Sequence, residues 1–123
     1  MKKVPIAGGT PILLATEGCC YATDVAVDGV SVFWSTSAGG GNGGILKVGI
    51  DGGTVTSLAS ANQPEDIAID SNFVYWAGNN GGPDERRGVR KVPLNGGAVT
   101  TVTTLGIPLA WGLVGSEVYL GFP

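Results

Sequence analysis

The sequence predicts an all-β fold in which one short hairpin unit occurs three times. Residues 3–9 (KVPIAGG) return as residues 47–53 (KVGIDGG) and again as residues 91–97 (KVPLNGG), so each copy starts 44 residues after the one before. The 22 glycines in 123 residues suit closely spaced turns. No segment sustains the 3.6-residue apolar period of a helix. We therefore expect strands and turns with negligible helix.

Each unit contains a turn signal between apolar runs. Asp51-Gly52 and Asn95-Gly96 favour two-residue hairpin turns, in which both turn positions take positive φ. Residues 39–44 (GGGNGG) indicate a flexible loop, because the Lys-Ser/Thr pair and helix of a phosphate-binding loop do not follow. The strands we expect cover residues 3–6, 11–15, 24–27, 30–35, 45–48, 54–58, 66–69, 73–76, 88–94, 98–103, 110–114 and 118–120.

Four short strands per period is the content of one β-propeller blade. Small residues at the aligned positions Ala26, Ala68 and Gly112 fit a crowded innermost strand. Residues 1–123 then form a half-propeller of three blade equivalents, with repeats at 3–46, 47–90 and, partially, 91–123. A β-sandwich is the main alternative, although it does not require such strict repetition. A solenoid comes third, because stacked solenoids usually have a shorter repeat.

Several segments of the repeat resemble those of a known family. Residues 45–53, residues 63–70 (QPEDIAID) and Val74-Tyr75-Trp76 are similar to repeats of six-bladed propellers of the YWTD and NHL-like kind, particularly bacterial secreted versions. The resemblance implies a propeller fold and a secreted parent protein. That superfamily includes lectin-like, lyase-like and purely protein-binding members, so the resemblance implies an architecture and no particular site.

Composition narrows the range of functions. The chain has no histidine, which excludes Ser-His and Cys-His nucleophile pairs and ordinary histidine metal sites. Its net charge of −3 and sequence pI of about 4.6 argue against a nucleic-acid or anionic-membrane partner. No apolar run approaches the roughly 18 residues of a membrane span. We expect no cofactor, no metal and no catalytic residue, with an enzyme the less favoured reading.

Candidate binding residues gather on one predicted face. If the strands of a blade run A to D from inner to outer, the longer B–C and D–A connections emerge together, and binding residues concentrate in such loops. The candidates for a small molecule or carbohydrate are Tyr21, Asp24, Glu65, Asp66, Arg86 and Arg87. The aspartates and the arginines have plainer explanations. The aspartates suit solvated or capping positions, and acidic neighbours can neutralise the arginines.

Cys19-Cys20 allows three interpretations. Two reduced thiols are the simplest. A vicinal disulfide would be strained, because adjacent Cα atoms lie about 3.8 Å apart and disulfides usually need about 4.4–6.8 Å. A zinc site would need more ligands than two thiolates without histidine supply.

These observations predict a non-enzymatic binding or interaction scaffold with its ligand on the B–C/D–A face. The alternative from a different class is a propeller-type lyase or hydrolase that uses channel carboxylates. A third reading is an isolated or engineered half-propeller whose only activity is self-assembly. Because three blades cannot close a ring, we expect a homodimer closing six blades, in which residues 118–120 of one chain pair with the strand of residues 4–6 of the other. A three-chain ring of nine blades is the runner-up.

Overall fold

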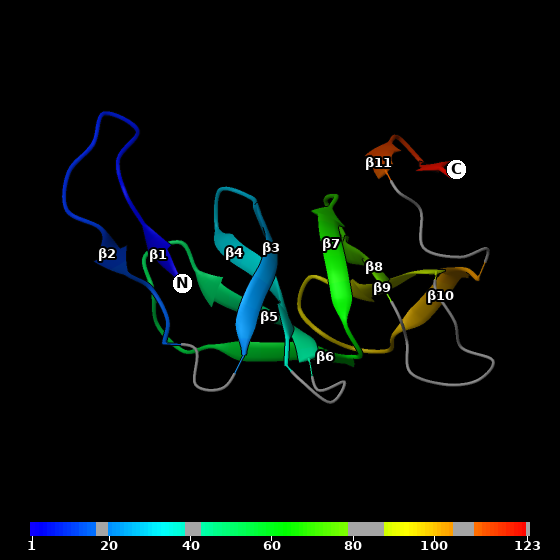
Figure 1. The fold of residues 1–123 in the computed structure, drawn as a ribbon, viewed down its shortest axis with the longest axis horizontal. Coiled ribbons are helices and arrows are strands. Elements are labelled where there is room, and N and C mark those ends of the chain that lie inside the picture. Colours follow the sequence, from blue (N-terminus) through cyan, green and yellow to red (C-terminus); the bar gives the residue numbers. More distant parts are fainter. Residues whose placement is uncertain (17–19, 39–42, 79–87, 105–109, 123) are drawn as a thin grey trace.

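The computed structural model describes residues 1–16, 20–38, 43–78, 88–104 and 110–122, and it confirms the all-β prediction (Figure 1). The strands in these ranges are β1 (Lys2–Lys3), β2 (Ile12–Leu13), β3 (Tyr21–Val27), β4 (Ser31–Ser37), β5 (Gly43–Gly49), β6 (Thr56–Ala61), β7 (Pro64–Ile69), β8 (Phe73–Gly78), β9 (Gly88–Pro93), β10 (Thr100–Thr103), β11 (Ala110–Val114) and β12 (Glu117–Gly121). The described ranges contain no helix.

The strands form four antiparallel sheets. Strands β3 to β6 form the first four-stranded sheet, and β7 to β10 form the second. Two more sheets are single hairpins, which we call the N-terminal hairpin (β1 and β2) and the C-terminal hairpin (β11 and β12). Figure 1 shows the N-terminal hairpin at one end of the row of sheets and the C-terminal hairpin towards the other end.

The sequence repeat is also a repeat of strand pairing. The unit's lysine opposes the residue nine positions later in every copy, in the pairs Lys3↔Ile12, Lys47↔Thr56 and Lys91↔Thr100. The hairpins made of β3–β4, β7–β8 and β11–β12 also share one register, in the pairs Ala26↔Phe33, Ala68↔Tyr75 and Gly112↔Tyr119. Aligned sequence positions are therefore equivalent structural positions.

The turns of the unit differ in type from the prediction. The N–H of Gly52 donates to the carbonyl of Gly49 at 2.9 Å, so Ile50 and Asp51 are the central turn residues. Positive φ falls on Gly52 (91°) and Gly53 (119°), and Asp51 keeps a negative φ. The expectation of positive φ at both Asp and Gly was wrong. The two glycines therefore supply the positive φ values just after the central turn residues, where the chain bends back towards the next strand.

Several strand boundaries also differ from those expected. Strand β5 already begins at Gly43, within the predicted flexible loop, because Gly43 pairs with both Ser37 and Ala61. A Cβ at Gly43 would lie 2.2 Å from the carbonyl oxygen of Thr36, so close strand approach explains this glycine. Strand β1 is shorter than the expected residues 3–6, and its edge away from β2 has no neighbouring strand in the hairpin.

The core lies between successive sheets. Phe33 and Ile45 of the first sheet pack in one cluster with Ile67 and Trp76 of the second. A second cluster joins the first sheet to Leu14 and Ala15, which follow β2. A third cluster joins the second sheet to the C-terminal hairpin through side chains that include Tyr75, Val89, Trp111 and Leu120. Each sheet thus buries its faces against its neighbours along the chain.

Candidate functional site

The end of the first sheet at which β3 begins has one hollow. Strand pairing places Tyr21 opposite Ser37, and Gly43 opposite both Ser37 and Ala61, so these residues share one end of the sheet. A cavity of about 260 Å³ lies there, lined by Cys20, Thr36, Gly43, Gly44, Leu46, Ser57, Ala59 and Ser60. Tyr21 is exposed and belongs to β3, where the sequence predicted a loop. The lining is mostly apolar, with hydroxyls from Thr36, Ser57 and Ser60, and the Thr36 hydroxyl donates to the carbonyl of Gly44 at 3.4 Å.

Asp24 holds two strands together. Its Oδ1 accepts a hydrogen bond from the N–H of Val25 at 2.8 Å, and its Oδ2 accepts one from the N–H of Ile67 at 2.9 Å. Ile67 belongs to β7, so the carboxylate joins the edge strands of two different sheets. Thr23, the bulged residue beside it, donates from its hydroxyl to the carbonyl of Pro64 at 2.9 Å. Both carboxylate oxygens of Asp24 therefore accept hydrogen bonds from backbone N–H groups, which gives this residue a structural role.

Glu65 and Asp66 lie on β7 at positions equivalent to Thr23 and Asp24. Both side chains are exposed, and β7 carries its bulge at the same place as β3. The prediction placed Glu65 in a connection, whereas it belongs to the strand. Strands β3 and β7 lie against each other, so Asp24 and Asp66 belong to neighbouring strands of two different sheets (Figure 1).

The remaining sequence candidates fall partly outside the structural description. Arg86, Arg87 and Cys19 lie outside the described residues. Cys20 is half-buried at the hollow. Because Cys19 lies outside the described residues, the choice between two thiols and a vicinal disulfide stays as the sequence analysis gave it. No group of three or more metal-ligating side chains gathers within the described residues. In the same residues, no helix is long and apolar enough to cross a membrane.

A partly buried tyrosine–aspartate pair was not predicted. The hydroxyl of Tyr75 donates to Oδ2 of Asp70 at 2.7 Å, while Oδ1 of Asp70 accepts from the N–H groups of Asn72 and Phe73. Burial raises the pKa of Tyr75 to about 12, reinforced by the hydrogen bond to Asp70 and its negative charge. Burial alone would raise the pKa of Asp70, but these hydrogen bonds and the charge of Lys91 outweigh it and lower that pKa.

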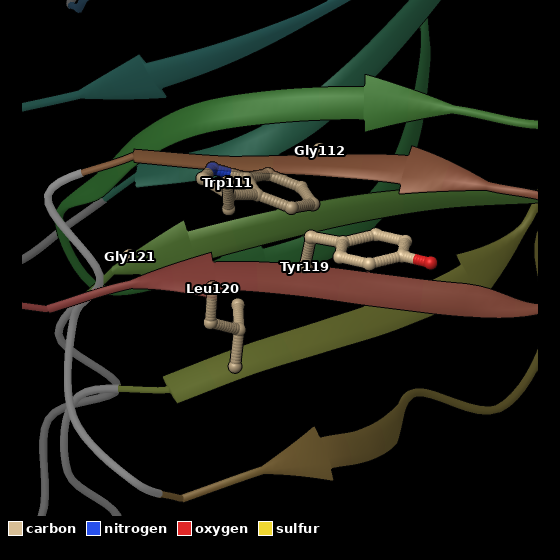
Figure 2. A pocket seen from close by; sticks show the side chains of 5 residues that line it. All are labelled: Trp111, Gly112, Tyr119, Leu120 and Gly121. Carbon is tan, nitrogen blue, oxygen red and sulfur yellow. The ribbon is translucent and has the colours of Figure 1, made fainter.

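The C-terminal hairpin leaves one face open. Trp111, Leu113, Val118 and Leu120 pack against the second sheet. Tyr119 pairs with Gly112, so its side chain projects from the opposite face and is exposed. An open hollow of about 380 Å³ lies at this hairpin, lined by Trp111, Gly112, Tyr119, Leu120 and Gly121 (Figure 2).

The N-terminal hairpin and the strand that follows it are open too. The exposed apolar side chains of the hairpin are Val4, Ile6, Ile12 and Leu13. Val25 and Val27 of β3 are also exposed. Sequence alignment of the repeats could have found Val4, Ile6, Val25 and Val27, because their equivalents elsewhere in the chain are apolar as well. The equivalents of Ile12 are the threonines Thr56 and Thr100. Both ends of the chain's row of sheets therefore present apolar surface.

No protein-family model matches the chain, and no curated protein matches its sequence significantly.

Proposed function

We propose that the chain is a half β-propeller that closes with a second copy of itself into a six-bladed ring and serves as a non-enzymatic interaction scaffold. Each four-stranded sheet is one blade in this proposal. The C-terminal hairpin of one chain and the N-terminal hairpin of the other form the third blade. The resemblance of residues 45–53, 63–70 and 74–76 to YWTD and NHL-like repeats supports this arrangement. Two chains of three blade equivalents lie within the range of four to eight blades.

Equivalent positions that differ in burial are the observation that carries the proposal. Phe33 is 0% exposed and Tyr75 is 9% exposed, each between two successive sheets, whereas the equivalent Tyr119 is 60% exposed. The aromatic residue recurs at a position that is buried wherever the next sheet is present. A partner that supplies the next sheet would bury Tyr119 as well.

The opposite end gives the complementary result. Ile67 on β7 is 8% exposed against the first sheet, whereas its equivalent Val25 on β3 is 50% exposed. Val48 and Val92 on the third strands of their sheets are 1% and 0% exposed, whereas their equivalent Val4 is 53% exposed. The surfaces that lack a neighbour are those that a C-terminal hairpin from another copy would cover.

Pairing within the complete sheets sets the register of the proposed junction. Val32 pairs with Val48 in the first sheet, and Val74 pairs with Val92 in the second. By the same rule, Val118 pairs with Val4 of the partner subunit. The new sheet then has the strand order of the other two. Pairing β12 of one chain with β1 of the other also covers two unpaired strand edges, which could otherwise pair with other chains and aggregate.

An experiment on Val25 tests the closure. Val25→Asp places a charge on a surface that is exposed in one chain and buried in the proposed ring, so it should convert dimer to monomer or unfolded chain. Val30→Asp is the matched control, because Val30 is also exposed and its repeat equivalents are the polar Asn72 and Ser116. Sedimentation that finds both variants with the mass of the wild type would overturn the proposal.

The ligand part of the proposal rests on the hollow around Cys20. Its mostly apolar lining and the hydroxyls of Ser57 and Ser60 suit a small molecule that has both apolar and hydroxyl groups, such as a carbohydrate. The enzymatic alternative needs Asp24 as an acid or base, and that carboxylate is held by two backbone N–H groups. Nuclear magnetic resonance titration with simple sugars tests the binding. Shifts at Thr36 and Ser57 support it, and unchanged spectra at millimolar sugar contradict it.

A further inference from the structure

Two lysines of the repeat tie each unit to the next one along the chain. The Nζ of Lys3 donates to the carbonyl of Ile50 at 2.9 Å and to Oδ1 of Asp51 at 2.8 Å. The Nζ of Lys47 donates to the carbonyl of Leu94 at 2.9 Å and to Oδ1 of Asn95 at 3.1 Å. In both cases, the acceptors belong to the turn of the following unit. The tie is therefore as regular as the repeat itself.

Lys91 is the third lysine of this series, and no fourth turn follows it in the 123 residues. Its Nζ lies 4.2 Å from the ring centroid of Phe73 and 6.0 Å from that of Tyr75. Lys47 also lies over an aromatic ring, 5.4 Å from the centroid of Phe33, while it donates to the next turn. The aromatic contact thus leaves the ammonium able to donate hydrogen bonds beyond the ring.

The N-terminal turn has the geometry that such a lysine needs. The N–H of Gly8 donates to the carbonyl of Pro5 at 2.9 Å, as Gly52 does to Gly49 and Gly96 does to Pro93. Gly8 also shares the φ of its equivalents, at 92° against 91° for Gly52 and 88° for Gly96. Ile6, which is equivalent to Ile50 and Leu94, is fully exposed.

We propose that Lys91 of each chain donates a hydrogen bond to the carbonyl of the partner's Ile6, which makes the turn at residues 5–8 the docking element of the two junctions. This inference rests on the proposed function, because it takes a second copy as the occupant of the open ends. Lys3 and Lys47 each donate to a turn carbonyl of the following unit. For Lys91, the turn in that position would be the one at residues 5–8 of the partner subunit.

One residue distinguishes the proposed junction from the two internal ties. Asp51 and Asn95 each supply a side-chain oxygen to the lysine, whereas their equivalent in the N-terminal turn is Ala7. The junction therefore has a carbonyl acceptor and lacks the side-chain acceptor. Ala7→Asp should restore it and form an ion pair with Lys91 of the other chain, as Asp51 does with Lys3.

A double-mutant cycle between Ala7→Asp and Lys91→Met tests the inference. The hairpin that carries Ala7 and the sheet that carries Lys91 lie towards opposite ends of the row, with the first sheet between them, so direct coupling must act between chains (Figure 1). Ala7→Asp should lower the apparent dissociation constant by roughly 2- to 30-fold, because an exposed ion pair would form at each of two junctions. Lys91→Met should abolish that gain, and 1 M salt should reduce it.

The matched control is the internal tie. Asp51→Ala with Lys3→Met should show coupling in unfolding of the chain, without a gain in dimer affinity from either change. All variants are compared by urea unfolding at several protein concentrations, which reports dissociation and folding together. A dimer in which Ala7→Asp has the same effect with and without the Lys91→Met substitution overturns the Lys91 contact and leaves ring closure standing. A wild type that unfolds independently of concentration overturns both.

Discussion

The Oδ2 atom of Asp24 lies 2.9 Å from the backbone nitrogen of Ile67, across the boundary between the two four-stranded sheets. This hydrogen bond and the one from Thr23 to the carbonyl of Pro64 join β3 directly to β7. Both ties use side chains at a bulge, where a strand turns a polar group out of its own ladder. The sheets are thus held at their edge strands by polar bonds and at their faces by the apolar core.

Asp24→Asn should destabilise the fold. The amide has one accepting oxygen, so one of the two N–H groups that Asp24 now engages loses its acceptor, at a cost of about 1–2 kcal/mol. Asp66→Asn is the control, because Asp66 has the equivalent position and an exposed side chain, and it should change stability by less than about 0.5 kcal/mol. Urea unfolding measures both. Equal losses would assign the effect to charge at this edge and not to the Ile67 bond.

The Tyr75–Asp70 pair predicts a loss of stability at high pH. The folded pKa of Tyr75 is raised to about 12, above the roughly 10 of an unfolded tyrosine. A raised pKa contributes stability that is full below about pH 10 and is lost as pH rises towards 12. Tyr75→Phe should cost about 1–2 kcal/mol at neutral pH and should flatten the alkaline limb. A Phe variant with the wild-type alkaline profile would contradict the assignment.

The same pair predicts a weaker effect in acid. The pKa of Asp70 is lowered from 3.8 in the folded chain. A lowered pKa contributes stability that is present above the unfolded value and is lost as pH falls through the folded one. Asp70→Asn removes the titration, so its stability should depend less on pH below about 4. Its one amide oxygen can replace only one of the two carboxylate oxygens, so a loss of stability at neutral pH accompanies the change. An unchanged acid limb would show that other carboxylates cause it.

Gly96 should resist substitution. Its φ is 88°, a conformation that a side chain at Cβ disfavours, so Gly96→Ala should destabilise the chain by about 1–2 kcal/mol. Gly29→Ala is the matched control, because Gly29 has no positive φ and a Cβ there would meet nothing within 4 Å. It should be neutral or stabilising by up to about 1 kcal/mol. Thermal unfolding separates the two, and equal effects would refute the backbone argument.

Local pattern predicted the strands well, because period and turn residues are properties of neighbouring amino acids. The triple repeat identified which positions are equivalent, and the pairing of Lys3, Lys47 and Lys91 confirms that equivalence. The exact turn geometry was missed. A dipeptide such as Asp51-Gly52 is compatible with more than one type of turn. In this structure, the hydrogen bond from the N–H of Gly52 to the carbonyl of Gly49 makes Ile50 and Asp51 the central turn residues.

The contacts between repeats were harder to predict. Lys3 and Asp51 are 48 residues apart, and only the packing of one sheet on the next brings them together. For Asp24 the sequence predicted a solvated or capping role, with a channel carboxylate as the alternative, and it did not predict the hydrogen bond from the N–H of Ile67. A signal did exist in the sequence. The lysine recurs at the 44-residue period, and the position after the turn's apolar residue holds Asp51 and Asn95 in the second and third units, so a tie at one junction implies a tie at the next.

Mass in solution tests ring closure most directly. Sedimentation equilibrium at micromolar concentration should give twice the chain mass of 12.4 kDa, or 24.8 kDa, with no folded species at the single-chain value. If the proposed ring forms, the urea midpoint should rise with protein concentration, because the ring would bury the surfaces around Tyr119 and Val25, which are exposed in the single chain. A folded species of 12.4 kDa with a concentration-independent midpoint would contradict the account.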